Sequence, residues 1–263
     1  MHDQIFKDLL EQNYSCIEFP VTPEQIRAAI AAYQEFLKLP MEIKSHISFT
    51  TNPNSRRGDV GYVERDPKDS VYNDRKRFFH YHDAIKSRYK EFLLQQPIVR
   101  RFVESASPIW QAAYNKGSEL MEIFEHKYPG IHSRFFAADE PEILLRFLMY
   151  DWQHPNENLA KPHYDVGSFT IAIGESDKGL RIGRSPETLK LIEHSPGEAV
   201  FMLAKNFPEL VDDNEFSPSW HDVVQVGETT NKPHARWAIV CFFEASGMSA
   251  VGRADARTPM KNG

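Results

Sequence analysis

The tripeptide His163-Tyr164-Asp165 places an imidazole and a carboxylate two positions apart. Side chains two positions apart lie on the same face of a β-strand, so His163 and Asp165 would present both groups side by side. A second imidazole is available at His221, which precedes the apolar, strand-like run Val223 to Val226. Two imidazoles and one carboxylate on one side of a metal ion leave its other coordination positions open. The three residues therefore predict a reactive metal site rather than a structural one.

The types of these ligands indicate which metal is bound. Neutral imidazole and carboxylate suit Fe(II), and two His with one carboxylate is the ligand set of non-haem Fe(II) oxygenases, whereas thiolates select softer metals. The two cysteines, Cys16 and Cys241, stand far apart in apolar, strand-like contexts. We expect two buried thiols in a reducing compartment, with a disulfide as the lesser alternative.

Arg236 opens a strongly apolar run that ends at Phe243. Such a run is too apolar for a surface strand, so the guanidinium at its start would lie in a partly dry place and require an anion. A dicarboxylate co-substrate would supply that anion.

These motifs resemble those of the isopenicillin N synthase-like Fe(II)/2-oxoglutarate dioxygenases. That family carries an H-x-D, a distal His in an H-x-V context and an R-x-S one hairpin later. The resemblance implies that His163, Asp165 and His221 bind iron and that Arg236 pairs with the distal carboxylate of 2-oxoglutarate. Two features depart from the family pattern: Ala238 replaces the Ser, and the spacing from His221 to Arg236 is longer than usual.

Further candidates come from the same resemblance. The apolar run Ile143 to Tyr150 is a predicted strand; it ends in the Tyr of the family's N-x-Y, which implies that Tyr150 contacts 2-oxoglutarate, with a buried structural role as the alternative. The Gly61-Tyr62 phrase resembles an element that borders the family's active site. Tyr62, Arg56 and Arg57 are therefore candidates for the substrate pocket, and a solvated loop is the alternative for this polar segment.

The remaining pattern indicates a β-rich core. Short apolar runs at 169–173, 179–183, 189–192 and 198–203 are separated by Gly and Pro turns, which favours a sandwich or jelly roll. The resemblance implies a mainly β protein with flanking helices and a double-stranded β-helix, or jelly-roll, core. A capping box at Thr22 to Gln25 predicts a helix. We expect a loop over 49–76 and mostly helix over 84–128, with breaks at Pro97 and Pro108.

The 263 residues suffice for one compact unit with a sizeable core. We expect a helical or mixed region at 1–135 packing on a jelly-roll oxygenase core at 136–245, followed by a flexible tail at 246–263. The tail carries little apolar surface, so it is either mobile or a lid ordered by ligand.

Charge and hydropathy bear on partners and location. The chain has 31 Lys and Arg against 37 Asp and Glu, a formal net charge of −6, which argues against nucleic acid and anionic membrane as partners. No long apolar run is present, and the first residues are charged where a signal peptide would be apolar. We expect a cytoplasmic protein that binds a small molecule.

The expected function is that of an oxygenase using Fe(II), O2 and 2-oxoglutarate to hydroxylate or desaturate a small molecule, with release of succinate and CO2. One alternative is an iron oxidase of the same fold that does not use 2-oxoglutarate. Another is a catalytically idle jelly roll that binds a small ligand. Intact His163, Asp165 and His221 argue against the idle protein.

Overall fold

The computed structural model describes residues 2–51, 59–65, 75–151, 158–193, 195–226 and 234–248. Its helices are α1 (His2–Gln12), α2 (Pro23–Leu37), α3 (Met41–Lys44), α4 (Ile85–Arg88), α5 (Lys90–Gln95), α6 (Pro97–Glu125), α7 (Ile131–Phe136) and α8 (Phe207–Val211), with a 3-10 turn η1 (Pro186–Thr188). Its strands are β1 (Ser15–Glu18), β2 (Ser48–Thr50), β3 (Asp59–Arg65), β4 (Lys76–Tyr81), β5 (Ile143–Tyr150), β6 (Asn158–His163), β7 (Phe169–Glu175), β8 (Leu180–Gly183), β9 (Lys190–Leu191), β10 (Glu198–Leu203), β11 (Trp220–Val224) and β12 (Arg236–Phe243).

The strands form two antiparallel sheets. The larger has the order β1-β10-β7-β12-β5-β4-β3-β2, and the smaller has the order β6-β11-β8-β9. Buried side chains of both sheets meet in one apolar cluster, with Leu148, Met202 and Ala238 from the large sheet and Leu159 and Val223 from the small one. The two sheets therefore enclose a core between them, and the predicted mainly β jelly roll with flanking helices is confirmed.

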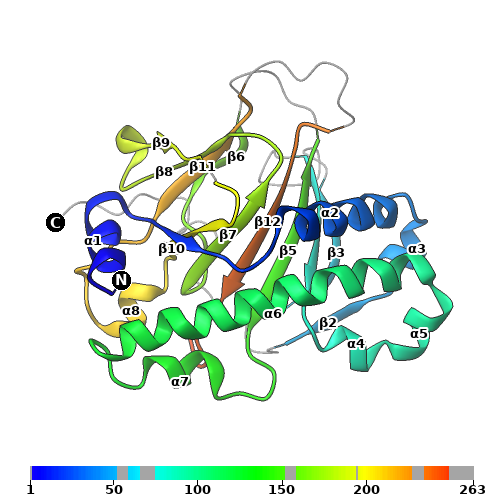
Figure 1. Cartoon of the computed structure of the whole chain (residues 1–263), viewed down its shortest axis with the longest axis horizontal. Coiled ribbons are helices and arrows are strands. Elements are labelled where there is room, and N and C mark those ends of the chain that lie inside the picture. Colours follow the sequence, from blue (N-terminus) through cyan, green and yellow to red (C-terminus); the bar gives the residue numbers. More distant parts are fainter. Residues whose placement is uncertain are drawn as a thin grey trace.

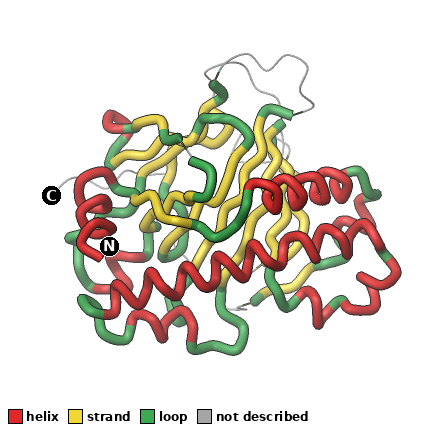
Figure 2. Tube along the Cα trace, viewed as in Figure 1, coloured by secondary structure: helices red, strands yellow, loops and turns green. Residues whose placement is uncertain are grey.

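Helices cover the opposite face of the large sheet. Figure 1 shows α6 running across that face with α2 beside it, and Figure 2 shows the helices gathered in front of the strands. The fit is close where Gly117 of α6 meets β12, because a Cβ atom at position 117 would lie 2.4 Å from Cε1 of Phe243. This helical layer fixes the back of the sheet whose other face lines the site.

Strand register aligns three residues that matter below. Tyr150 at the end of β5 is paired with Lys76 of β4 on one side and with Arg236 of β12 on the other. Side chains of paired residues lie on the same face of a sheet. Lys76, Tyr150 and Arg236 therefore form a row across three adjacent strands. Residues from both sides of position 135 contribute to this sheet.

Several local predictions are confirmed. The Thr22 hydroxyl accepts from the Gln25 backbone N–H, and the Gln25 side chain accepts from the Thr22 N–H, so the capping box is present. The runs predicted as strands at 143–150 and 198–203 have those bounds, as does the apolar run that Arg236 opens. Among the described residues, no helix combines the length and apolar character that a membrane span requires.

Three local predictions are wrong. The segment 49–76 is not all loop, because 59–65 forms β3 between β2 and β4. Pro108 lies inside α6 without ending it, because the apolar face of this long helix packs along the sheet and outweighs one lost backbone hydrogen bond. Cys16 is exposed on edge strand β1, whereas Cys241 is buried, and both are free thiols.

Candidate metal centre

The end of β6 and the start of β11 bring His163 and His221 together. The two residues are paired directly across the strands, and their ring centroids are 4.4 Å apart. Asp165 follows two residues after His163, and its Oδ1 lies 3.7 Å from Nε2 of each histidine. One ligand atom from each residue lies within 4.8 Å of the others. The structure thus gathers the three predicted ligands around one point.

Hydrogen bonds on the outer side fix each ring. Nδ1 of His163 lies 2.7 Å from the Lys161 carbonyl oxygen, and Nδ1 of His221 lies 3.0 Å from the Ser219 carbonyl oxygen. A carbonyl oxygen only accepts, so each Nδ1 carries the proton and each Nε2 keeps its lone pair. Both lone pairs then face the carboxylate, which is the tautomer that a metal ligand requires.

Asp165 is held in the same manner. The Thr170 hydroxyl on β7 donates to Oδ2 of Asp165 at 2.8 Å, and the Asp165 backbone carbonyl accepts from the Lys205 N–H at 2.9 Å. These bonds leave Oδ1 on the side of the histidines. Burial, and next the neighbouring His221, lower the pKa of His163. A neutral imidazole pair with an oriented carboxylate fits a divalent metal ion.

A cavity opens from the three ligands and runs between the two sheets. Its walls are mainly apolar and come from both sheets: Leu148, Ala160, Ala172, Gly174, Leu180, Met202, Val223, Ala238, Val240 and Phe242. The described part of its polar lining consists of the three ligands with Lys76, Arg146, Tyr150, Glu175 and Arg236. Among the described residues, His163, Asp165 and His221 are the group of His, Cys, Asp and Glu side chains that lie close enough together to hold a metal ion.

One end of the cavity is closed and charged. Arg236 is 3% exposed, Tyr150 4% and Lys76 7%. The Arg236 guanidinium lies 5.9 Å from the centroid of the Tyr150 ring, and the Lys76 ammonium lies 5.8 Å from it. Burial lowers the pKa of Arg236 to about 10, so the group remains charged at neutral pH. This end is suited to a carboxylate.

Arg236 already has protein partners at this closed end. It forms an ion pair through Nη2 with Oε2 of Glu175, whose side chain is also buried, and its Nε donates to the Asp177 carbonyl oxygen at 2.9 Å. Ala238, two positions on and also lining the cavity, supplies no hydroxyl there. An incoming carboxylate would therefore share Arg236 with Glu175.

The other sequence candidates lie elsewhere or outside the description. Tyr62 packs its ring 5.8 Å from that of Phe36 and donates to Glu64 at 2.9 Å; it is not part of the cavity lining. Arg56 and Arg57 lie outside the described residues, as does most of the tail. Tyr150 and Arg236 do line the cavity with the three ligands.

Four polar residues of the site escaped the sequence reasoning: Lys76, Arg146, Thr170 and Glu175. Lys76 lies on β4, which the sequence pattern does not predict, and Arg146 lies on β5, which it does. Nothing in the sequence shows that these two strands pair. Thr170 and Glu175 are the two polar side chains of the otherwise apolar strand β7, and that contrast was the available signal. It does not state which residues they touch.

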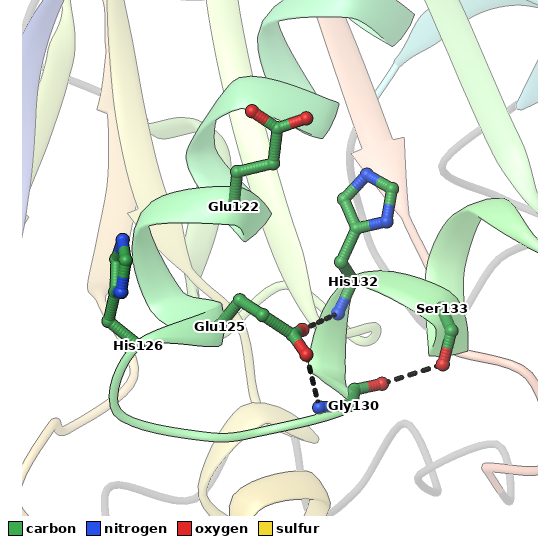
Figure 3. A pocket seen from close by; sticks show the side chains of 6 residues that line it. All are labelled: Glu122, Glu125, His126, Gly130, His132 and Ser133. Atoms are coloured by element: carbon green, nitrogen blue, oxygen red, sulfur yellow. Dashed lines mark hydrogen bonds between the residues drawn. The ribbon is translucent and has the colours of Figure 1, made fainter.

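A second hollow lies at the protein surface between α6 and α7, and Figure 3 shows the residues around it. The Glu125 carboxylate accepts from the backbone N–H groups of Gly130 and His132, at 2.5 and 2.9 Å. It thereby satisfies backbone donors at the start of α7, which is a structural role. This hollow is separate from the metal centre.

Comparison with known proteins was made by sequence and by structure. No protein-family model matches the sequence, and no curated protein matches it. The solved structures that match include a full-length Neurospora crassa protein in complex with alpha-KG and 5-formyluracil, with a TM-score of 0.70 and 16% identity over 94% of this chain and 79% of that one. The fold is that of the 2-oxoglutarate- and Fe(II)-dependent oxygenases.

Two further solved structures share this fold. AtDAO1 from Arabidopsis thaliana, a dioxygenase for auxin oxidation in complex with 2-oxoglutarate, matches with a TM-score of 0.70 and 16% identity over 95% of this chain and 90% of that one. JOX2 in complex with 2OG, Fe and JA matches with a TM-score of 0.67 and 17% identity over 93% of this chain and 71% of that one. The match therefore extends over nearly the whole chain, helical layer included.

Proposed function

We propose that this protein is an oxygenase that uses Fe(II) and 2-oxoglutarate to oxidise a small molecule, with release of succinate and CO2. The observation that carries the proposal is that the three metal-ligand residues and two buried cations line the same cavity. His163, Asp165 and His221 present one donor atom each at one end, and the buried cations Lys76 and Arg236 lie at the closed end. The fold shared with the dioxygenase AtDAO1 and with two proteins solved in complex with alpha-KG or 2OG supports the same function.

Each residue has a role in this proposal. His163, Asp165 and His221 hold the iron, which supplies oxidation chemistry with O2 when bound. Arg236 and Tyr150 hold the distal carboxylate of 2-oxoglutarate, and Lys76 adds a second positive charge beside Tyr150. The apolar walls exclude water from the reacting end of the cavity.

One observation favours a second candidate function. The Glu175 carboxylate already balances the charge of the Arg236 guanidinium. Ala238 also lacks the Ser hydroxyl of the R-x-S motif in the isopenicillin N synthase-like family. An iron oxidase of the same fold would leave this pair intact and would take all electrons from its own substrate. The two candidates differ in whether 2-oxoglutarate binds at the metal.

The test is an anaerobic titration of the Fe(II)-loaded protein with 2-oxoglutarate, followed by visible absorption. Chelation of iron by 2-oxoglutarate gives a weak charge-transfer band, and we expect that band in the wild type. Arg236→Gln should weaken 2-oxoglutarate binding about 10- to 100-fold through loss of a charge-assisted interaction. Arg100→Gln, at an exposed arginine of α6, is the matched control and should bind like the wild type.

The outcomes separate the candidates. Iron binding without the band would exclude use of 2-oxoglutarate and favour the oxidase. No iron binding would exclude both enzymes and leave a ligand-binding jelly roll. A band that is unchanged in Arg236→Gln would retain the oxygenase but assign the distal carboxylate to other cations, of which Lys76 is the nearest along the row.

A further inference from the structure

The cavity carries a third cation, Arg146, at the end away from Arg236. Arg146 precedes Tyr150 by four positions on β5, so both side chains lie on the same face of the sheet, and both line the cavity with the metal ligands. Arg146 is half-buried, as are its neighbours Val240 and Phe242, whereas Tyr150 and Arg236 are buried. Arg146 therefore lies toward the accessible end of the cavity.

Two aromatic rings contact the Arg146 guanidinium. Its Cζ atom lies 4.8 Å from the ring centroid of Phe78 on β4 and 4.4 Å from that of Phe242 on β12. Cation–π attraction from both rings restricts the guanidinium while its charge is kept. Such an ordered guanidinium loses little further freedom when it binds a carboxylate.

His80 orients the same group. Nε of Arg146 donates to Nε2 of His80 at 2.8 Å, and Nδ1 of His80 lies 2.9 Å from the Asp59 carbonyl oxygen. The carbonyl only accepts, so Nδ1 of His80 carries the proton and Nε2 accepts from Arg146. In this arrangement the imidazole is neutral, so His80 positions Arg146 without cancelling its charge.

Arg146 and Arg236 stand at different levels along the sheet. Arg146 is paired with Val240 on β12, and Val240 follows Arg236 by four positions, which corresponds to roughly 13 Å along a strand. A five-carbon dicarboxylate that chelates a metal with one end has a single distal carboxylate to offer. If Arg236 holds 2-oxoglutarate, Arg146 can serve a different anion.

The charge of the cavity agrees with a second anion. Among the described side chains that line the cavity, Lys76, Arg146 and Arg236 oppose the two carboxylates Asp165 and Glu175, an excess of one positive charge. The two positive charges of Fe(II) are matched by the two negative charges of 2-oxoglutarate. One negative charge on the substrate would complete the balance, which a largely apolar cavity favours.

We propose that the primary substrate is a small apolar molecule with one carboxylate, and that Arg146 binds this carboxylate while Phe78, Phe242 and His80 hold Arg146 in place. The apolar walls around Arg146 and the metal ligands would contact the rest of the substrate. This inference rests on the proposed function, because it assumes that Arg236 serves 2-oxoglutarate. It names the substrate class and the residue that selects it.

The test uses four monocarboxylates with their matched primary amides as neutral counterparts: hexanoate, octanoate, phenylacetate and 3-phenylpropanoate. Binding to the Fe(II)- and 2-oxoglutarate-loaded protein is measured by anaerobic calorimetry. We expect at least one acid to bind about 10-fold or more tightly than its amide. Arg146→Gln should lower the affinity for that acid about 10- to 100-fold and leave the amide within about twofold.

Two further variants control this comparison. Arg146→Lys keeps the charge and loses the planar fork, so it should retain part of the preference for the acid. Arg100→Gln on α6 should behave like the wild type. The proposal is overturned if no acid is preferred over its amide by the wild type, or if the preference persists in Arg146→Gln.

The charge-transfer band keeps this result separate from the proposed function and reports folding of the variant. Arg146→Gln should give the band with a 2-oxoglutarate affinity within about twofold of the wild type, since the two anion sites lie apart. A preference for acids that depends on Arg146, in a protein without the band, would reject the proposed function and retain the anion site. A normal band without any preference for acids would retain the proposed function and reject the anion site at Arg146.

Discussion

Glu175 and Arg236 form a buried ion pair at the closed end of the cavity, with 7% and 4% of their side chains exposed. The carboxylate of Glu175 occupies the guanidinium that we assign to 2-oxoglutarate. The protein thus carries an internal competitor beside its co-substrate site.

Replacement of Glu175 by Gln should therefore strengthen 2-oxoglutarate binding, because the amide no longer repels the incoming carboxylate. We expect the dissociation constant to fall about 3- to 10-fold in the anaerobic titration. The free protein should lose about 3–5 kcal/mol of unfolding free energy, since Arg236 loses its charged partner. Glu193→Gln, at an exposed carboxylate paired with Lys178, is the control. Weaker 2-oxoglutarate binding in Glu175→Gln would show instead that Glu175 positions Arg236.

Ala238 offers a gain-of-affinity prediction. It lies two positions after Arg236 on the same face of β12 and is 5% exposed. A hydroxyl at position 238 would donate to the distal carboxylate of 2-oxoglutarate that Arg236 binds. Such an interaction with a charged partner is worth about 1.5–3 kcal/mol. Ala238→Ser should bind 2-oxoglutarate about 10-fold more tightly, measured by the same titration. Ala32→Ser, in α2 on the other side of the sheet, should have no such effect, and unchanged affinity in Ala238→Ser would place the carboxylate elsewhere.

Thr170 should influence iron affinity without touching the iron. Its hydroxyl holds Oδ2 of Asp165, so Thr170→Val frees the carboxylate to turn. Loss of such an outer partner commonly lowers metal affinity about 10- to 100-fold, to be measured by anaerobic competition with a chelator. The matched control is Thr50→Val, which removes a similar hydrogen bond to Asp59 on strands β2 and β3. Equal iron affinity in the two variants would contradict this role.

His82 makes stability depend on pH. It is 2% exposed, and burial lowers its pKa below the ordinary 6.5. Its Nε2 lies 3.0 Å from the Pro141 carbonyl oxygen, and its Nδ1 accepts from the Ala84 N–H, which requires the neutral ring. Below pH 6.5 the unfolded chain binds a proton that the folded chain does not, so stability falls as pH falls from 6.5 toward the folded pKa.

Denaturant unfolding from pH 8 to pH 5, compared between the wild type and His82→Gln, measures this contribution. Both proteins should lose stability toward acid, and the wild type should lose more between pH 6.5 and pH 5, because only it carries the buried imidazole. Equal slopes in the two proteins would assign the acid sensitivity to other groups.

The metal centre was readable from the sequence because its residues carry their own signals. His163 and Asp165 stand two apart, and His221 and Arg236 each precede an apolar strand. Lys76 could not be found, since its place beside Tyr150 depends on how β4 aligns with β5, and strand register is set by the whole sheet. The role of Arg146 likewise needs Phe78 and Phe242 from two other strands. Glu175 could be read as a polar end of a strand, but not as the partner of Arg236.

For the fold, too, local sequence patterns predicted some elements, whereas tertiary packing decided others. Strands such as β5, β10 and β12 are apolar at all positions but one and were assigned with their observed bounds. β3 was missed because its polar residues and flanking turn formers outweigh Val60 and Val63 in the pattern. Pro108 was read as a break because local preference says so, whereas the packing of α6 against the sheet decides the outcome.

The row of Lys76, Tyr150 and Arg236 spans strands from distant parts of the chain, and β4 comes before the segment that contains the metal ligands. The proposed site is therefore not contained in the segment that carries its most recognisable motifs. A fragment beginning at β5 would keep the proposed iron ligands and Arg236. It would lose Lys76, Phe78 and His80, and with them one side of both anion sites. Differences in substrate among proteins of this architecture can accordingly arise in the first third of the chain, which contains none of the metal-ligand motifs.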